Sequence, residues 1–584
     1  MMLGKRQHQL IIDSVFLGIV GALGAQVFML LLHWAQKIFL GFAQYHPPGL
    51  PEEGGVLQQV IGPHGLWLIP VVTTVGGLLS GLLVYTFAPE AEGHGTDTAV
   101  KAYHFAGGFI RARVSPLKAV ASAITIGSGG AAGREGPTAL ISAGIGSIYA
   151  TLFHRPEEER RLLVLMGMAA GLAAIFRSPV GTAFFAIEVL YSAMEFEAFA
   201  LLYVLLASIV AYTINGLFVG FDPLFSVPPM GMPAFSDYFW YILLGLVAGV
   251  VAAMLPSIFY YTRDAFHAIP IPPHIKPAIG GLLLGLMALW LPQVLGGGYG
   301  WIQLAINGNM ALTTMLILVL AKMVAMALTV SSGGSGGVFA PGLFVGAMLG
   351  GTMASLFHLS SAAFVVVGMA AVFAGAARVP MATLLMVTEM TGGYHLLVAA
   401  ALAVSISYIV EVLLTSKLKY KSLYEAQVPG RADSPAHHGD YLKAALHILK
   451  NHNITLSAED EHVDLERLLD TGVPIDLAED KQLRLAQLSK KSPMADRPVR
   501  ELLDHLPEDL ITEVRVAAII RNSHTLVPYG DLVMRSGDRV LIIAPGRAWP
   551  SLLPYFEFND MTNPDRTNPT SVDHDCANRA EPDP

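Results

Sequence analysis

A glycine-rich stretch at residues 127–137, GSGGAAGREGP, carries the charged pair Arg134 and Glu135 at the end of an apolar segment. A second stretch of this kind, SSGGSGGVFAP, occupies residues 331–341. Glycine lets the chain bend sharply, and each bend leads into a segment that we predict to be a helix, starting at Glu135 and at Phe339. A helix start presents unpaired N–H groups and the positive end of the helix dipole, which favour an anion. The two stretches therefore predict an anion site where the helix starts meet.

The same glycines have an alternative interpretation. Gly127, Gly129 and Ala132 satisfy the loose pattern of a dinucleotide-binding loop. That pattern requires a preceding strand in a βαβ unit and an acidic residue about twenty positions later. Because the pattern lies inside a strongly apolar part of the chain, we favour the anion site.

The distribution of charge divides the chain into two parts. The chain has 36 basic and 45 acidic residues, and residues 431–584 hold 43 of these 81 charges. Residues 323–377 form a run of 55 uncharged residues, which a large soluble protein would not tolerate. We therefore predict a membrane domain over residues 1–430. The segments long enough to cross ~30 Å of hydrocarbon are Ser14–Gln36, Gly54–Pro89, Ala198–Phe221, Tyr238–Thr262, Pro277–Ala321 and Met323–Ala377.

The basic N-terminal sequence MMLGKRQHQL precedes an apolar segment without a small-residue cleavage site, so we expect a retained helix rather than a signal peptide. Lys5, Arg6 and the basic loop near Arg111–Lys118 favour a cytoplasmic N-terminus. The single cysteine, Cys576, gives no role to disulfides or to cysteine metal sites.

The membrane domain contains an internal repeat. The sequence MGMAAGLAAIFRSPVGTAFFAIEVL, from Met166, aligns with VGMAAVFAGAARVPMATLLMVTEM, from Val367, at an offset of 201 residues. The two glycine-rich stretches align at an offset of 204 residues. We infer two related halves, about 10–215 and 238–426. Repeated halves with glycine-interrupted apolar segments are typical of transporters, whose broken helices meet near the middle of the membrane.

Three motifs resemble those of the CLC chloride channels and transporters: Gly-Arg-Glu-Gly-Pro at 133–137, Gly-Val-Phe-Ala-Pro at 337–341, and SLYEAQ with Tyr424. The resemblance covers residues 10–426. It implies a polytopic all-α membrane protein with a CLC-type inverted-repeat fold of about eighteen full and partial helices. It also implies a homodimer with one anion pathway per subunit, in a prokaryotic plasma (inner) membrane, with both termini cytoplasmic. Chloride, and other small anions, would be the transported ligands.

The resemblance also implies the roles of individual residues. Glu135 is expected to be the gate: its carboxylate occupies an anion position and leaves when it is protonated or displaced. The alternative is that Glu135 simply pairs with Arg134, although adjacent residues on a helix do not face each other. Mutating Glu135 to alanine should leave transport present but ungated. The expected anion-binding residues are His94, Gly95, Arg134, Glu135, Gly136, Val338, Phe339, Ala340 and Tyr424.

One departure from the family pattern lies in GHGTD, residues 93–97. Many members have Gly-Ser-Gly-x-Pro there, with the serine hydroxyl on the central anion. His94 takes the serine position and Asp97 the proline position. Two interpretations stay open, because the imidazole can donate a hydrogen bond to the anion or can turn away and leave only backbone groups.

A second departure bears on proton coupling. Proton-coupled members carry an internal glutamate directly after the position of Glu188, where this chain has Val189, which cannot carry a proton. A relay through Glu188 is an alternative, but one step along a helix turns a side chain by about 100°. Glu188 also has a repeat partner in Glu389, which suggests a structural role shared by both halves. We predict a passive, Glu135-gated chloride channel; the alternative is a Cl⁻/H⁺ antiporter with a proton route other than Val189.

The polar part begins with a linker and helical connector over residues 431–494: breakers dominate residues 428–440, and residues 441–492 have roughly helical spacing. Residues 495–556 alternate like strands and resemble the TrkA-C regulatory domain of potassium-uptake proteins. That resemblance implies a small cytoplasmic α/β dimerising module that often senses a small ligand; the alternative is a dimerisation domain that binds nothing. Residues 557–584 are polar and proline-rich and are predicted to be a disordered tail.

The sequence lacks the features that two other classes of protein would require. A cation transporter regulated through a TrkA-C module would need filter loops of the TVGYG type, which the sequence does not contain. An intramembrane enzyme would need a motif such as HExxH, whereas Glu135, Glu188 and Glu389 lie on separate motifs without metal-ligand spacing. We therefore expect no enzymatic activity, no metal, no cofactor and no nucleic-acid partner.

Overall fold

The structure, a computed structural model, describes residues 2–437 and, with gaps, residues 475–558. The chain forms two compact units, Met1–Ala436 and His437–Pro584. The first unit ends close to the boundary expected at residue 430. The helical connector expected over residues 441–474 and the tail from residue 559 onward lie outside the described residues.

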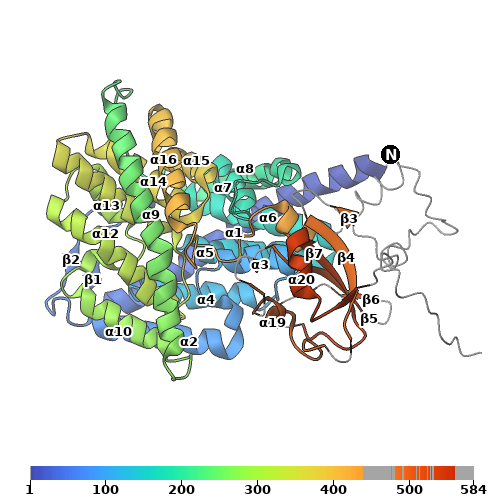
Figure 1. Cartoon of the computed structure of the whole chain (residues 1–584). Coiled ribbons are helices and arrows are strands. Elements are labelled where there is room, and N and C mark those ends of the chain that lie inside the picture. Colours follow the sequence, from blue (N-terminus) through green and yellow to red (C-terminus); the bar gives the residue numbers. More distant parts are fainter. Residues whose placement is uncertain are drawn as a thin grey trace, which may run out of the picture. The chain divides into compact units, whose positions relative to one another are not determined.

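The first unit is built from helices (Figure 1). Those of the first half are α1 (Met2–Phe42), α2 (Ile69–Phe87), α3 (Thr96–Phe105), α4 (Val114–Gly127), α5 (Glu135–Leu152), α6 (Glu157–Phe176), α7 (Pro179–Glu188) and α8 (Ala198–Val219). Those of the second half are α9 (Asp237–Ala268), α10 (Lys276–Ala288), α11 (Tyr299–Ile306), α12 (Leu312–Met326), α13 (Phe339–Phe357), α14 (Ser361–Ala377), α15 (Pro380–Thr391) and α16 (Leu397–Thr415). A two-stranded sheet of β1 (Tyr45–His46) and β2 (Val60–Ile61) lies in the connection between α1 and α2.

The first unit contains both long apolar helices that could cross a membrane and short helices that could not. Seven of the described helical segments are long and apolar enough to cross a bilayer: Arg6–Phe42, Ile69–Phe87, Ala198–Val219, Asp237–Ala268, Leu312–Ser331, Phe339–Phe357 and Tyr394–Thr415. By contrast α3, α7, α11 and α15 have 10, 10, 8 and 12 residues. A spanning helix needs about 20 residues, so these four end inside the protein, as the repeat predicted.

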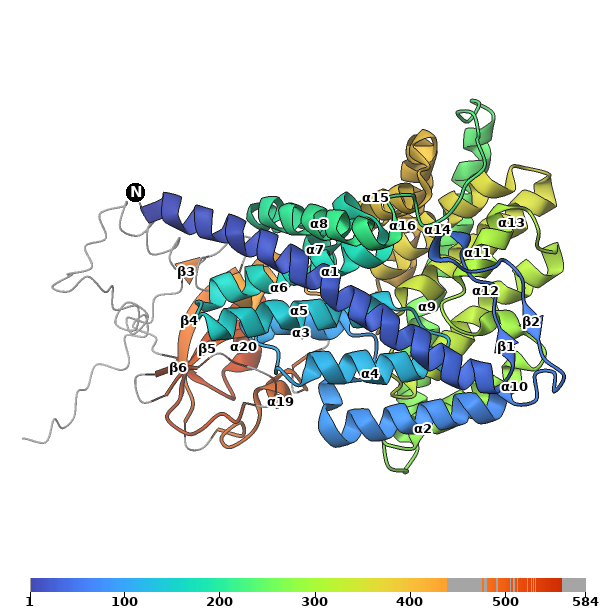
Figure 2. The ribbon, with the colours of Figure 1, turned by 180° about the vertical axis from the view of Figure 1, so that it is seen from behind.

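The two halves have the same order of elements, and several helices pack on their counterparts. Helix α2 packs on α10, and α7 packs on α15. The backbone repeats as well, because α6 ends at Arg177 with φ 53° and α14 ends at Arg378 with φ 55°. Helix α1 runs along α4, α5, α6 and α8 on one face of the unit (Figure 2). The fold class expected from the sequence, an inverted-repeat all-α membrane unit followed by a small sheet domain, is confirmed.

The second unit contains a six-stranded antiparallel sheet with the order β3-β4-β7-β5-β6, with β8 paired to β4. The strands are β3 (Ile475–Asp476), β4 (Lys481–Gln487), β5 (Arg515–Arg521), β6 (His524–Leu526), β7 (Arg539–Pro545) and β8 (Glu557–Phe558). The short helices α19 (Val499–Asp504) and α20 (Trp549–Leu552) accompany the sheet. Leu502, Ile542 and Trp549 belong to its main buried core.

One part of the predicted connector is wrong. Residues 481–487 form strand β4, which pairs with β7 along its whole length. Leu483 and Leu485 are both buried, two positions apart, which is the period of a strand. We had interpreted this spacing as helical, although the sheet domain begins before residue 495.

Candidate anion pathway

The two glycine-rich stretches meet at the centre of the first unit. The amide N–H of Gly133 donates to the carbonyl oxygen of Gly337 at 2.7 Å, and the N–H of Gly337 donates back to Gly133 at 2.7 Å. Helix α5 begins two residues later at Glu135, and α13 begins at Phe339. This reciprocal pair therefore holds two helix N-termini side by side, at the helix starts that the sequence predicted.

Two further helix starts join them. Helix α3 begins at Thr96 after Gly95, whose φ is 85°, and α11 begins at Tyr299 after Gly298, whose φ is 84°. A positive φ favours glycine, so each glycine supplies the bend that starts the helix. Thr96 and Tyr299 are thus equivalent first residues of equivalent short helices in the two halves.

A small cavity lies at this junction. Its volume of about 10 Å³ corresponds to roughly one water molecule. The lining residues are Thr96, Glu135, Gly136, Leu172, Phe176, Phe185, Val338, Phe339 and Tyr424. Of the predicted site residues, the structure therefore brings Glu135, Gly136, Val338, Phe339 and Tyr424 together around one cavity.

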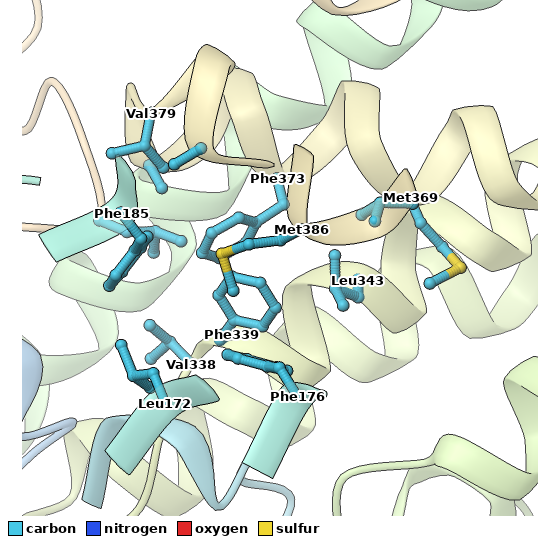
Figure 3. Packing of buried hydrophobic residues seen from close by; sticks show 14 of the residues in the cluster. Leu172, Phe176, Phe185, Val338, Phe339, Leu343, Met369, Phe373, Val379 and Met386 are labelled. Atoms are coloured by element: carbon cyan, nitrogen blue, oxygen red, sulfur yellow. The ribbon is translucent and has the colours of Figure 1, made fainter. Parts of the chain in front are cut away.

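Aromatic side chains make much of the cavity wall (Figure 3). The ring of Phe339 lies 4.5 Å from Phe176 and 4.2 Å from Phe373, measured between ring centroids. Phe185 packs edge-on against both Phe339 and Tyr424. Because the wall is apolar, polar groups at the cavity act in a setting where electrostatic interactions are stronger than in water.

The Glu135 carboxylate lies between the starts of α5 and α13. The residue is 1% exposed, and the hydroxyl of Tyr299 donates a hydrogen bond to its Oε1. The backbone N–H groups of Glu135 itself and of Ala340 interact with the carboxylate. A Cβ at Gly133 would collide with Oε2 of Glu135, so only glycine leaves room for the carboxylate here. The carboxylate therefore sits where helix N-termini favour an anion.

Arg134 points its guanidinium to a different carboxylate. Its Nη1 and Nη2 donate to Glu53 at 3.1 and 2.5 Å, and its guanidinium lies 4.8 Å from the centre of the Tyr299 ring. The Nε atom of Arg134 lies 3.9 Å from Oε1 of Glu135, which is an ion-pair distance but not a hydrogen bond. The hydrogen-bonding partners of Glu135 are therefore Tyr299 and backbone groups, rather than its neighbour in the sequence.

Tyr424 and Thr96 place two hydroxyl groups at the cavity. The Tyr424 side chain is 2% exposed and hydrogen-bonds with Thr96. Sequence reasoning predicted Tyr424 but missed Thr96 and Tyr299. The local repeat of a glycine before each short helix was the signal that could have found both residues.

Comparison with known proteins identifies the family of the chain. The family model described as voltage gated chloride channel matches residues 76–412, and a TrkA-C domain model matches residues 483–556. This chain belongs to the voltage gated chloride channel (CLC) family. The C-terminal sheet unit is a TrkA-C domain.

Two relatives illustrate the range within the family. The H(+)/Cl(−) exchange transporter ClcA of Salmonella agona is 32% identical over 386 residues, which cover 63% of this chain and 80% of the relative. A putative chloride channel protein ClcB-like of Ralstonia nicotianae is 30% identical over 354 residues, which cover 59% of this chain and 82% of the relative.

Solved structures share the fold. A CLC-type fluoride/proton antiporter matches with a TM-score of 0.60 and 23% identity, over 72% of this chain and 98% of that chain. A slow cyanobacterial Cl⁻/H⁺ antiporter matches with a TM-score of 0.60 and 22% identity, over 71% of this chain and 95% of that chain.

His94 departs from the CLC pattern and does not line the cavity. Its ring packs edge-on against Tyr424 at 5.4 Å and Phe259 at 6.1 Å, between ring centroids. The ring of His94 therefore contacts Tyr424, which lines the cavity, and both interpretations of His94 stay predictions. Gly95, Arg134 and Ala340 also lie beside the cavity without lining it, Gly95 as the residue before α3 and Ala340 through its N–H.

Two buried lysines hold the bends of this CLC site in place. Lys118 donates to the carbonyl oxygens of Ala91 and Gly93 at 2.9 and 2.7 Å, ahead of α3. Its counterpart 204 positions later, Lys322, donates to two carbonyl oxygens ahead of α11 at 2.8 and 2.6 Å. Both side chains are fully buried. The lysines bind the carbonyl groups of the bends and so fix the chain just before α3 and α11.

The residues that bear on proton coupling lie on α7 and next to α3. Val189 is fully buried at the end of α7. Glu188 accepts hydrogen bonds from the N–H groups of Met381 and Ala382 at 3.1 and 2.7 Å, and so is bound to the start of α15. Asp97, at the second position of α3, accepts from the N–H of Ala426 at 2.8 Å.

Proposed function

We propose that this protein is a chloride/proton exchanger in which Glu135 gates an anion pathway, one in each subunit of a homodimer. The observation that carries the proposal is the position of the Glu135 carboxylate between the starts of α5 and α13. A carboxylate and a chloride ion are both monovalent anions, so they compete for the same helix N-termini. Transport of an anion then requires Glu135 to leave.

Protonation supplies the reason for it to leave. A neutral carboxyl group has lost its charge attraction to the helix ends, and an incoming anion replaces it. When the carboxyl group later releases its proton on the other side and returns, one proton has moved against the anion. This cycle couples the two fluxes through one residue.

A passive chloride channel is the second candidate. The observation that favours it is Val189, which we had interpreted as the loss of proton coupling. The relatives named H(+)/Cl(−) exchange transporters support exchange instead. We therefore place exchange first, with a proton route that does not use Val189.

The experiment is chloride efflux from liposomes that contain the purified protein, with external pH recorded at the same time. The experiment starts with no proton gradient. Chloride that leaves down its own gradient should then drive protons into the liposomes. The Glu135→Ala variant should still carry chloride but move no protons. Chloride efflux without proton movement in the wild-type protein would establish the passive channel.

We further propose that the protein resides in a prokaryotic inner membrane with both termini in the cytoplasm, where the TrkA-C domain would respond to a small ligand. The ClcA and ClcB-like relatives named above come from bacteria, which supports this location. A shift in chloride flux on addition of candidate nucleotides or ions to the cytoplasmic side would test the regulatory role.

A further inference from the structure

Exchange requires a titratable group that takes up protons and passes them on to Glu135, and Val189 cannot be that group. An apolar wall does not pass protons, so the route needs a titratable side chain connected to the cavity through hydroxyl groups or water. The identity of the residue that begins this route rests on the proposed exchange function.

Most buried carboxylates of the membrane unit are already engaged. Glu188 accepts two backbone N–H groups of α15, and Glu411 accepts a hydrogen bond from Arg378 at 3.1 Å. Glu389 accepts hydrogen bonds from the start of α7. Each of these contacts favours a fixed, charged carboxylate.

Asp97 is placed differently. It follows Thr96, which lines the cavity, and its Oδ1 accepts from the N–H of Ala426, two residues after Tyr424. Within residues 2–437 no basic side chain lies within salt-bridge distance of its carboxylate. Asp97 is therefore a half-buried carboxylate next to the cavity whose charge is not fixed by an ion pair.

The charged and titratable groups that face Asp97 are known from every neighbouring element. Three charged residues interact with Asp97 through their charges. They are Lys101 on the same helix, Arg263 on α9 and Glu425 on the segment after α16. Arg263 is bound to Glu425 at 2.5 Å, which balances most of its charge locally. The remaining neighbours are the hydroxyl groups of Tyr260 and Tyr424.

Tyr424 lies between Asp97 and the gate. Asp97 accepts the N–H of Ala426, two residues after Tyr424, and Tyr424 lines the cavity together with Glu135 and Thr96. This cavity has room for about one water molecule. Hydroxyl groups and water both donate and accept hydrogen bonds, so they can pass a proton without a net change in themselves.

We propose that Asp97 is the inner proton-transfer residue of this exchanger and takes the place of the carboxylate missing at Val189. A proton from water binds the Asp97 carboxylate and gives a neutral acid. The proton then passes through the hydroxyl groups of Tyr424 and Thr96, or the cavity water, to the Glu135 carboxylate. Asp97 returns to its anionic form, and Glu135, now neutral, leaves the anion position.

A purely structural role for Asp97 makes a different prediction. A carboxylate in the first turn of α3 complements the helix dipole, and its bond to Ala426 fixes the segment that carries Tyr424. An asparagine keeps a carbonyl oxygen for that bond but cannot carry a proton. Asp97→Asn therefore separates the two roles.

The test compares proton and chloride fluxes of the full-length protein in liposomes. The variants are Asp97→Asn, Asp97→Glu and, as a control, Glu158→Gln, which removes an exposed carboxylate of α6 that is bound to Arg6. Asp97→Asn should keep chloride flux while its proton-to-chloride ratio falls by about tenfold or more. Asp97→Glu should retain coupling, and Glu158→Gln should couple like the wild type.

The outcomes separate the two proposals. If the wild type itself moves no protons, the exchange function fails, and this inference fails with it. If the wild type couples and Asp97→Asn couples equally well, the exchange function stands and the role of Asp97 in proton transfer is overturned. Loss of coupling in Glu158→Gln but not in Asp97→Asn would also overturn it. If Asp97→Asn carries no chloride, Asp97→Ser gives the same comparison with a smaller non-titratable side chain.

Discussion

Glu188 and Glu389, 201 positions apart, each bind the start of the helix that carries the other. Glu188, at the end of α7, accepts the N–H groups of Met381 and Ala382 in α15. Glu389, in α15, accepts the N–H groups of Val180 and Gly181 in α7 at 3.2 and 2.9 Å. Helix N-termini inside a membrane need such acceptors because no water reaches them. The pair fastens the two halves of the protein together.

This arrangement predicts that Glu188 and Glu389 serve stability rather than proton transfer. Replacing either with glutamine keeps one acceptor oxygen but loses the charge, and should lower the free energy of unfolding by about 1–3 kcal/mol. Both variants should melt earlier in detergent by similar amounts and keep the wild-type proton-to-chloride ratio. A change in that ratio in Glu188→Gln alone would revive the relay through Glu188.

Tyr299 should hold the gate shut. Its hydroxyl donates to the Glu135 carboxylate, and a hydrogen bond to a charged group contributes about 1.5–3 kcal/mol. Tyr299→Phe should therefore favour the departure of Glu135 and raise chloride flux at neutral pH by about tenfold. Tyr261→Phe, on an exposed tyrosine of α9, is the matched control and should leave the flux unchanged. Equal fluxes for Tyr299→Phe and the wild type would show that this bond does not limit opening.

The central hydroxyl should belong to Thr96 rather than to the residue at position 94. Thr96→Val removes a hydroxyl from the cavity while keeping its shape, and should weaken chloride binding by about two- to tenfold. His94→Ser, which restores the common family residue, should change binding less, because His94 does not line the cavity. Thr98→Val, one residue after Asp97 on α3, controls for effects on the helix. Titration calorimetry with chloride gives the affinities, and a larger loss at His94 would contradict the geometry.

Some of this site was predictable from the sequence and some was not. The helix starts at Glu135 and Phe339 follow from glycines before apolar segments, which act locally. Contacts between distant segments do not follow, and Tyr299 meets Glu135 from 164 positions away. The side-chain direction of His94 depends on Phe259 and Tyr424, which come from two other parts of the chain.

The sheet domain shows a different limit. Strand β4 was missed because the alternation of Leu483 and Leu485 is too short to stand out from the helical spacing of the residues before it. Its pairing with β7, more than fifty residues later, decides the matter. Strand β7, by contrast, lies within residues 495–556, for which the alternation predicted strands.

The two buried lysines should have separable effects on the two ends of the site. Lys322→Met leaves the carbonyl groups of Val294 and Gly296 without their donor, which costs about 1–3 kcal/mol and loosens the bend that positions Tyr299. Its chloride flux should rise as in Tyr299→Phe, and the double variant should gain little more, because both changes act on the same contact. Lys118→Met acts on the bend before Thr96 and should weaken chloride binding instead. Stopped-flow chloride efflux and calorimetry on the three variants would measure both effects. Fully additive fluxes in the Tyr299→Phe, Lys322→Met pair would show that the lysine does not act through Tyr299.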